Sequence, residues 1–140
     1  MKTIAKTRIL SAAEVLAFDT NVEYEIFPAP ASGWILKPKY FIVAKLSGTA
    51  VGAAGGAWTF VYSGETTALA TIADVVSDAV LATGTTAATY TMAFTEAATD
   101  QAVIAGDSAA KGISFKSANT TTNSDCKLQV TVVADLIKIG

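Results

Sequence analysis

The stretch Phe27–Trp34, FPAPASGW, interrupts a run of residues that otherwise alternates as a β-strand does. Before it, residues 22–26 (VEYEI) alternate apolar and acidic side chains, the two-residue period of a half-buried strand. After it, residues 34–46 continue in β-branched and aromatic residues. Pro28 and Pro30 have no N–H to donate to a strand ladder, and the Ser-Gly pair that follows favours a turn. We therefore predict a rigid corner that joins two strands.

The rest of the chain repeats the strand pattern, with Gly, Asn, Asp and Thr clusters between the strands. Several short strands separated by turn residues are typical of a β-sandwich or barrel. Two segments look helical: residues 11–14 (SAAE) have capping-box spacing, and apolar residues recur every three or four positions between 69 and 80. The strands that we predict are 22–27, 34–37, 39–46, 58–63, 89–95, 112–117 and 126–134.

Alternation also predicts which side chains form the core and where the domain begins. We expect residues 1–20 to form an N-terminal arm and residues 21–140 to form one β-sandwich domain. Both tryptophans, Trp34 and Trp58, lie in strand patterns that are typical of core positions. The other core positions that we predict are Tyr24, Ile26, Phe41 or Ile42, Phe60, Phe94, Phe115, Leu128 and Val130.

The composition indicates an uncharged surface made of small residues. Of 140 residues, 51% are hydrophobic and only 16% are charged, against about 25% in ordinary soluble domains. Alanine and threonine make up a third of the chain, which predicts that part of the surface lies against other protein. A net charge of −2 argues against nucleic acid as the main partner, since phosphate binding needs a basic face.

Candidate catalytic groups are few. The chain has no histidine and one cysteine, which excludes Ser-His and Cys-His pairs and zinc sites built on histidines or several cysteines. Cys126 shares a strand face with apolar residues and is expected to be a buried structural thiol. Asp74 and Asp78 would share an exposed helix face, and Glu23 and Glu25 face outward. We predict no enzyme activity, no cofactor and no metal.

Targeting and membrane signals are also weak. Glu14 interrupts the apolar run that a signal peptide would need near the N-terminus. Residues 46–64 lack charge, but their five glycines and several hydroxyls favour a glycine-rich loop that enters a strand over a membrane helix. Lys37-Pro-Lys39 is typical of a guarded edge strand, and two lysines do not make a nucleic-acid groove. We expect no membrane and no nucleic-acid partner.

The order of these segments resembles a family of small tailed-phage virion proteins, the capsid cement or decoration proteins of jelly-roll type. The likeness runs through the corner, a glycine-rich loop, the aromatic strand AWTFVYSG, the short helix in ATIADVVSDAVL and the closing strand CKLQVTVVADLIKI, over roughly residues 20–137. It implies an all-β fold, a jelly-roll-like β-sandwich of two antiparallel sheets with one or two short helices. It also implies a protein made in the host cytoplasm that decorates the outside of an icosahedral head and bridges subunits of the major capsid protein.

Two other classes of function stay open at this point. One is a phage tail, receptor-binding or carbohydrate-binding β-sandwich module, which an exposed tryptophan would support. The other is a hydrolase on a β-sandwich that uses carboxylates. For a cement protein we expect a symmetric homo-oligomer, with a dimer favoured and a trimer possible, because dimers are the commonest closed assemblies.

The charges are unevenly spread along the chain. Residues 46–110 contain six acidic residues and no basic one, whereas the rest holds ten basic residues against six acidic ones. We interpret this as a basic end that docks on an acidic capsid surface, with the N-terminal arm ordered by that contact as an added strand. The candidate capsid-contact residues are Lys2, Lys6, Arg8, Lys37 and Lys39.

Overall fold

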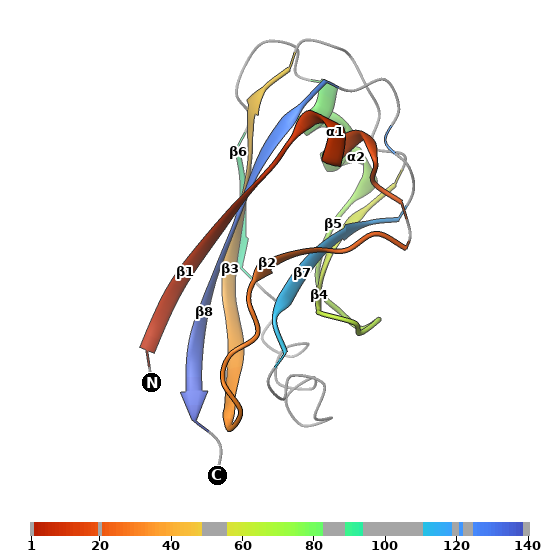
Figure 1. Cartoon of the computed structure of the whole chain (residues 1–140). Coiled ribbons are helices and arrows are strands. Elements are labelled where there is room, and N and C mark those ends of the chain that lie inside the picture. Colours follow the sequence, from red (N-terminus) through yellow and green to blue (C-terminus); the bar gives the residue numbers. More distant parts are fainter. Residues whose placement is uncertain are drawn as a thin grey trace.

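The computed structural model describes residues 2–19, 21–48, 56–82, 89–93, 111–118, 121 and 125–138. Within these residues the chain forms eight strands and two short helices, and the strands build two packed sheets (Figure 1). In chain order the elements are β1 (Lys2–Leu10), α1 (Ala12–Leu16), β2 (Tyr24–Phe27), β3 (Trp34–Ser47), β4 (Trp58–Tyr62), β5 (Ala68–Ile72), α2 (Asp74–Ala82), β6 (Thr89–Ala93), β7 (Ile113–Ser117) and β8 (Lys127–Lys138).

The strand order is that of a jelly roll. One sheet, here the β1 sheet, has the order β1-β8-β3-β6, and the other, the β2 sheet, has the order β2-β7-β4-β5. The first strand pairs with the last, the second with the second-last, and so on inward, and every pair is antiparallel. The described part of the chain is thus one long hairpin rolled into two sheets of four strands each. The predicted fold class, a jelly-roll-like sandwich of two antiparallel sheets, is confirmed.

The proline corner carries the chain from one sheet to the other. Residues 28–33 join β2, in the β2 sheet, to β3, in the β1 sheet. Gly33 adopts a φ of 86°, which a residue with a side chain rarely takes, and the Trp34 N–H donates to the Ala31 carbonyl at 3.1 Å. The predicted corner between two strands is confirmed, and its position explains why the sequence stops alternating there.

Pro38 does not end a strand. The segments predicted as 34–37 and 39–46 form the single strand β3, and its pairing with β8 shifts register between Pro38 and Tyr40. A bulge at this point leaves one residue out of the ladder, so the missing N–H of proline is tolerated.

Residues 2–10 do not form an arm outside the sandwich, in contrast to our expectation. They form β1, which pairs with β8 along its whole length, from Lys2 opposite Leu136 to Leu10 opposite Leu128. Leu10 is fully buried in the core. The expected boundary at residue 20 therefore does not separate the first strand from the sandwich.

The helical pattern between residues 69 and 80 was only half right. Leu69 and Ile72 lie on β5, where Ala70 stands opposite Phe60 of β4. The helix α2 begins only at Asp74. Pairing with β4 outweighs the helical spacing here, because a short apolar run fits a strand as well as a helix. The capping box is confirmed: the Glu14 N–H donates to Ser11 Oγ at 3.2 Å, and the Ser11 N–H donates to Glu14 Oε1 at 3.1 Å.

The core lies between the two sheets and is rich in aromatic rings. Phe115 has its ring centroid 5.8 Å from that of Phe18, 5.5 Å from Trp58 and 5.2 Å from Phe60. Of the predicted core residues, Ile26, Phe41, Trp58, Phe60, Phe115, Leu128 and Val130 are buried, Tyr24 packs half-buried against them, and Phe94 lies outside the described residues.

Two buried polar side chains flank this core. Burial raises the pKa of the Cys126 thiol to about 11, although the nearby Lys45 ammonium opposes the shift. Cys126 is therefore an inert structural thiol, as predicted. Lys45 is also buried, and its Nζ donates to the Leu81 carbonyl at 3.1 Å, which caps the last turn of α2.

We predict that Phe115→Ala lowers the free energy of unfolding by about 3–5 kcal/mol, because the truncation leaves a cavity among three other rings. Urea unfolding followed by circular dichroism measures this change. Ile9→Ala is the matched control, since the Ile9 side chain is 53% exposed and its truncation leaves no cavity. Equal effects of the two substitutions would contradict the assigned core.

Candidate functional site

The two faces of β1 have opposite characters. Residues at even positions face the space between the sheets: Leu10 is in the core, and Ile4 and Lys6 line a cleft. Residues at odd positions face away from the β2 sheet. Thr3 Oγ1 donates to Asp135 Oδ1 at 2.6 Å, and the Thr7 and Thr131 hydroxyls are hydrogen-bonded at 2.8 Å.

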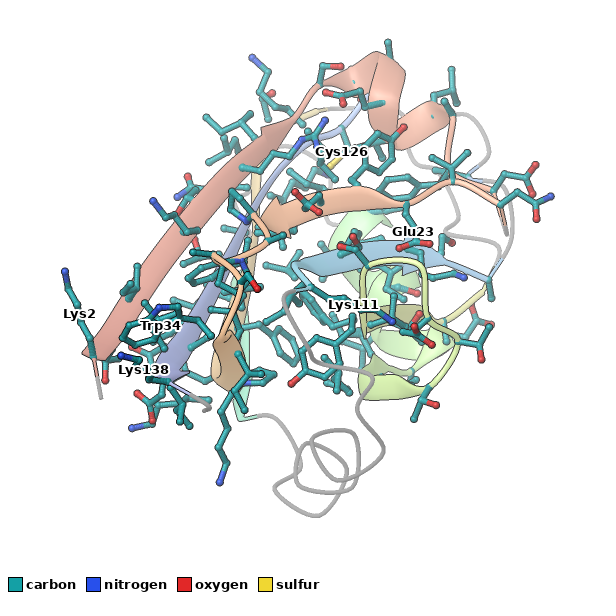
Figure 2. The ribbon with its side chains drawn as sticks, turned by 60° about the horizontal axis from the view of Figure 1, so that its bottom comes forward. Lys2, Glu23, Trp34, Lys111, Cys126 and Lys138 are labelled. Atoms are coloured by element: carbon teal, nitrogen blue, oxygen red, sulfur yellow. The ribbon has the colours of Figure 1, made fainter. Side chains whose placement is uncertain are left out.

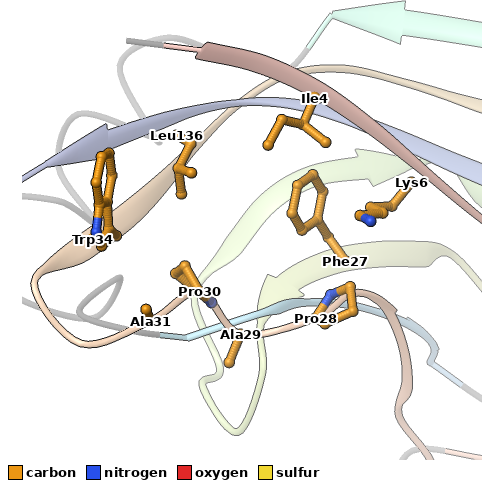
Figure 3. Close-up of a pocket in the computed structure, with 9 residues that line it drawn as sticks. All are labelled: Ile4, Lys6, Phe27, Pro28, Ala29, Pro30, Ala31, Trp34 and Leu136. Carbon is orange, nitrogen blue, oxygen red and sulfur yellow. The ribbon is translucent and has the colours of Figure 1, made fainter.

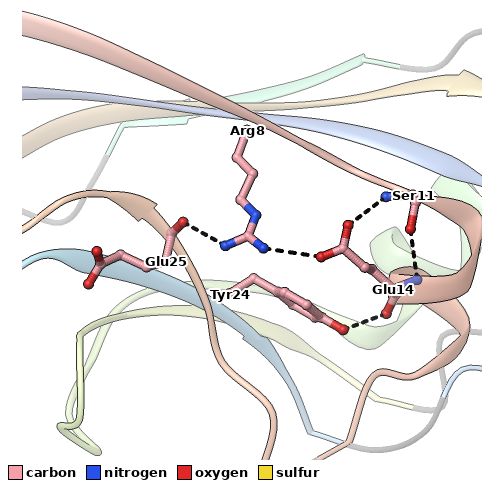
Figure 4. Close-up of polar contacts among 5 residues, drawn as sticks. All are labelled: Arg8, Ser11, Glu14, Tyr24 and Glu25. Carbon is pink, nitrogen blue, oxygen red and sulfur yellow. Dashed lines mark hydrogen bonds and ion pairs between the residues drawn. The ribbon is translucent and has the colours of Figure 1, made fainter.

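Arg8 closes the edge of the sandwich where β1 approaches β2 (Figure 4). Its Nη1 donates to the Glu25 carbonyl oxygen, and its Nη2 pairs with Glu14 Oε2, both at 3.1 Å. The guanidinium lies 5.3 Å from the centroid of the Tyr24 ring, and the Tyr24 hydroxyl donates to the Glu14 carbonyl at 2.9 Å. Together these contacts join β1, α1 and β2, and we call them the edge clamp.

The protonation of the edge clamp follows from its geometry. The backbone hydrogen bond from Ser11 lowers the pKa of Glu14, Arg8 lowers it further, and partial burial opposes both. Burial raises the pKa of Tyr24, which keeps its hydroxyl protonated as a donor. At neutral pH the clamp therefore holds a carboxylate, a guanidinium and a phenol.

A second feature is the uncharged outer face of the β1 sheet. Three adjacent rungs cross β1, β8 and β3 in register, and none of them carries a charge. Ile9 and Tyr40 are 53% and 40% exposed. The rungs, which we call the outer face, are Ala5–Val133–Tyr40, Thr7–Thr131–Ile42 and Ile9–Gln129–Ala44.

At the end near the start of β8, Lys127 lies beyond the Gln129 rung, opposite Ser47 of β3. Charge also returns at the other end of this face. The next rung is Thr3–Asp135–Lys37, and Asp135 is only 6% exposed. Lys39 Nζ lies 3.8 Å from Asp135 Oδ2. Lys37 and Lys39 thus lie around a buried carboxylate at the end of the outer face that is nearest the C-terminus of β8.

The five predicted contact residues do not form one patch. Lys37 and Lys39 belong to the outer side of the β1 sheet, whereas Lys2, Lys6 and Arg8 belong to the inner side of β1. Arg8 is committed to the edge clamp. Among the described residues, neither Lys2 nor Lys6 has an ion-pair partner.

The corner encloses a cleft of about 320 Å³ at the open end of the sandwich (Figure 3). Residues 28–31 form one wall, Ile4 and Lys6 of β1 form the opposite wall, and Phe27, Trp34 and Leu136 lie between them. We call it the corner cleft. Trp34 was predicted to be in the core, but it is only half-buried because the corner bends away from it. At this end Lys138 stands opposite Trp34 and Lys2 stands opposite Leu136 in the ladder (Figure 2).

Sequence reasoning missed both the outer face and the corner cleft. Each is built partly from β1, and residues 2–10 were assigned to an arm. The available signal was in TIAKTRIL (3–10), where every odd position is uncharged and both basic residues fall at even positions.

The described parts of the chain contain neither a candidate metal site nor a candidate membrane helix. No three His, Cys, Asp or Glu side chains there are grouped so that they would hold a metal ion. No helix in those parts is long and apolar enough to cross a bilayer.

Comparison with known proteins gives structural but no sequence matches. No family model and no curated protein matches the chain. The structure is similar to a chain of the acid-stable capsid of Helicobacter pylori bacteriophage KHP30 (TM-score 0.48, 11% identity, all of this chain and 94% of that one). It is also similar to a chain of the cyanophage Pam1 capsid (0.45, 12%, 99% and 84%) and to the vertex protein of PRD1 (0.37, 10%, 97% and 73%).

We predict that Glu14→Gln lowers the free energy of unfolding by about 0.5–1 kcal/mol at neutral pH, because glutamine keeps the cap but loses the ion pair with Arg8. The pKa of Glu14 in the folded state lies below its ordinary value of 4.5. Its charge therefore stabilises the fold fully above about pH 4.5, and this contribution disappears as the pH falls through the lower folded-state pKa.

Urea titrations of wild type and Glu14→Gln across this pH range measure the effect. The difference between the two proteins should shrink as the pH falls. Glu23→Gln is the control, since Glu23 is exposed and glutamine can still accept the Gly64 N–H. A difference that stays constant down to low pH would contradict the clamp.

Proposed function

We propose that the chain is a structural virion protein that decorates the outside of an icosahedral phage head and cements neighbouring capsid subunits. The observation that carries this proposal is the outer face, three uncharged rungs on a sheet of paired strands. Depletion of charged residues is what distinguishes the centre of a protein interface from the rest of a surface. The resemblance of residues 20–137 to cement proteins supplies the kind of partner.

The chemistry of the outer face suits a broad and rigid contact. Threonine, alanine and valine lose little side-chain freedom on burial, so ordering them costs little. Ile9 and Tyr40 are the large exposed side chains of the outer face, and a partner would bury them. The strand ladder fixes all of them before the partner arrives, which reduces the entropic cost of association.

The lysines around the outer face would orient the protein on the head. Lys37 and Lys39 lie at one end of the face, and complementary charge on the major capsid protein would set the docking direction. Attachment would then weaken with added salt. We include in the proposal that the chain forms a homodimer at a two-fold position of the capsid, with a trimer as the second choice.

The amount of the chain in purified particles tests this function. Mass spectrometry of heads from the phage that encodes it gives its ratio to the major capsid protein. Hundreds of copies per particle are the expected result. Six, twelve or eighteen copies would indicate a tail component, and absence would indicate a protein that is not part of the virion.

We predict that Ile9→Glu lowers the occupancy of the chain on heads at least tenfold. The substitution places an unpaired charge where the interface excludes water, which costs more than the roughly 1.4 kcal/mol that a factor of ten represents. Occupancy is measured by adding purified protein to heads that lack it.

Leu16→Glu is the matched control for this experiment. Leu16 lies on α1, away from the outer face, and is exposed to a similar extent, 48%. The outer face is not the docking surface if both variants lose occupancy to the same extent, or if neither variant loses any.

A further inference from the structure

The corner cleft is an unfilled end of the sandwich interior. Leu10 of β1 and Val132 of β8 face the β2 sheet and are fully buried. Farther along the same two strands, Ile4 and Leu136 face the same way but are only half-buried. The corner bends away from them and leaves their apolar surface open (Figure 3). A ligand with an apolar side chain would complete this end of the core.

The positive charge around the corner cleft indicates which polar groups a ligand would carry beside its apolar side chain. Lys6 lies in its wall, and the other described residues that line it are apolar. Lys2 stands on the same face of β1, and Lys138 stands opposite Trp34 in the ladder (Figure 2). Among the described residues, no acidic side chain lines the cleft. The occupant therefore combines an apolar side chain with carboxylates.

The backbone of β1 beside the cleft can pair with an added strand. Among the described strands, β1 is an edge strand that pairs only with β8, so its other edge presents backbone N–H and C=O groups to which a further strand could bond. The edge clamp covers this edge at Arg8, but residues 2–6 lie beyond it. An extended segment added there would direct alternate side chains toward the cleft.

A second copy of this chain is a poor occupant of that edge. If two β1 strands paired antiparallel about Ile4, Lys2 of each copy would stand opposite Lys6 of the other. Like charges directly opposite each other destabilise a strand pair. The same two lysines favour a strand that carries acidic residues at the matching positions.

We propose that the corner cleft and residues 2–6 of β1 bind an extended acidic segment of a partner protein, which adds a strand to the β1 sheet. In antiparallel pairing, an acidic-x-apolar-x-acidic pattern places carboxylates opposite Lys6 and Lys2 and the apolar side chain opposite Ile4. This inference rests on the proposed function only for the identity of the partner, the major capsid protein. The binding chemistry belongs to the cleft itself.

The test uses the full chain and a blocked hexapeptide, acetyl-Glu-Thr-Leu-Thr-Glu-Thr-amide, which has this pattern. Binding is followed by the fluorescence of Trp34, since Trp58 is fully buried and gives a constant background. We expect a saturable change that weakens in high salt. Two control peptides, with Lys in place of both Glu or with Ser in place of Leu, should bind at least tenfold more weakly.

Substitutions in the chain determine where the peptide binds. Lys6→Gln should weaken binding about threefold, the effect of one partly exposed ion pair. Lys127→Gln is the matched control, because Lys127 is exposed at the far end of β8 and should have no effect. Ala31→Phe should abolish binding, because it fills the cleft without removing a backbone hydrogen bond. Equal binding of the acidic and basic peptides, or no effect of Lys6→Gln, would overturn the proposal.

A neutral oligosaccharide, maltotriose, is tested alongside. Saturable binding of the sugar without binding of the acidic peptide would assign the cleft to glycans and overturn the proposal. Attachment to heads separates this inference from the function proposed above. If heads bind the wild-type chain and the Lys2→Gln/Lys6→Gln variant equally, the proposed strand-binding role of the corner cleft is wrong, but the cement function is unaffected. If the chain binds the peptide but is absent from heads, the cement function is wrong and the binding role of the corner cleft stands.

Discussion

The pairing of β8 between β1 and β3 is the constraint on which the rest of the structure depends. β8 is the last strand of the chain, and it joins the first strand to the one that follows the proline corner. The outer face exists only when these three strands are in register, because each rung takes one residue from each strand. The corner cleft depends on the same register, since Ile4 of β1 and Leu136 of β8 both line it. Both surfaces are therefore products of the closed roll, and a segment of the chain alone has neither.

The architecture could be predicted from the sequence because most strands have one buried face. The alternation around Ile26, Phe60, Phe115 and Val130 predicts strands, and all four side chains are buried. The corner was also predictable, since proline and glycine act through local geometry that needs no partner. What alternation alone did not give was the pairing of strands. That step came from the resemblance to jelly-roll proteins and agrees with the strand order.

β1 could not be predicted because its inward face breaks the usual rule. Lys2, Lys6 and Arg8 occupy inward positions, whereas Ala5, Thr7 and Ile9 point outward. A half-buried strand normally shows the reverse. The lysines are tolerated because the cleft is open to water at that end, and Arg8 is tolerated because Glu14 and the Glu25 carbonyl satisfy it. A strand whose inward positions carry basic residues resembles a polar arm in the sequence, and only its pairing with β8 shows that it belongs to the sandwich.

The charge pattern shows the same limit at the level of the site. The sequence correctly indicates that basic residues gather near the N-terminus and the corner, but it does not tell which of them remain available. The structure divides them: Arg8 holds the sandwich edge closed, Lys39 pairs with the buried Asp135, and Lys6 stands in an apolar wall. A neighbouring carboxylate partly offsets the electrostatic field of a cation, whereas a cation among apolar side chains acts on a ligand with its full field. The two halves of β1 thus differ. The half near Leu10 is closed by the protein's own groups, whereas the half near Lys2, among the described residues, has an open edge and two lysines without an ion-pair partner.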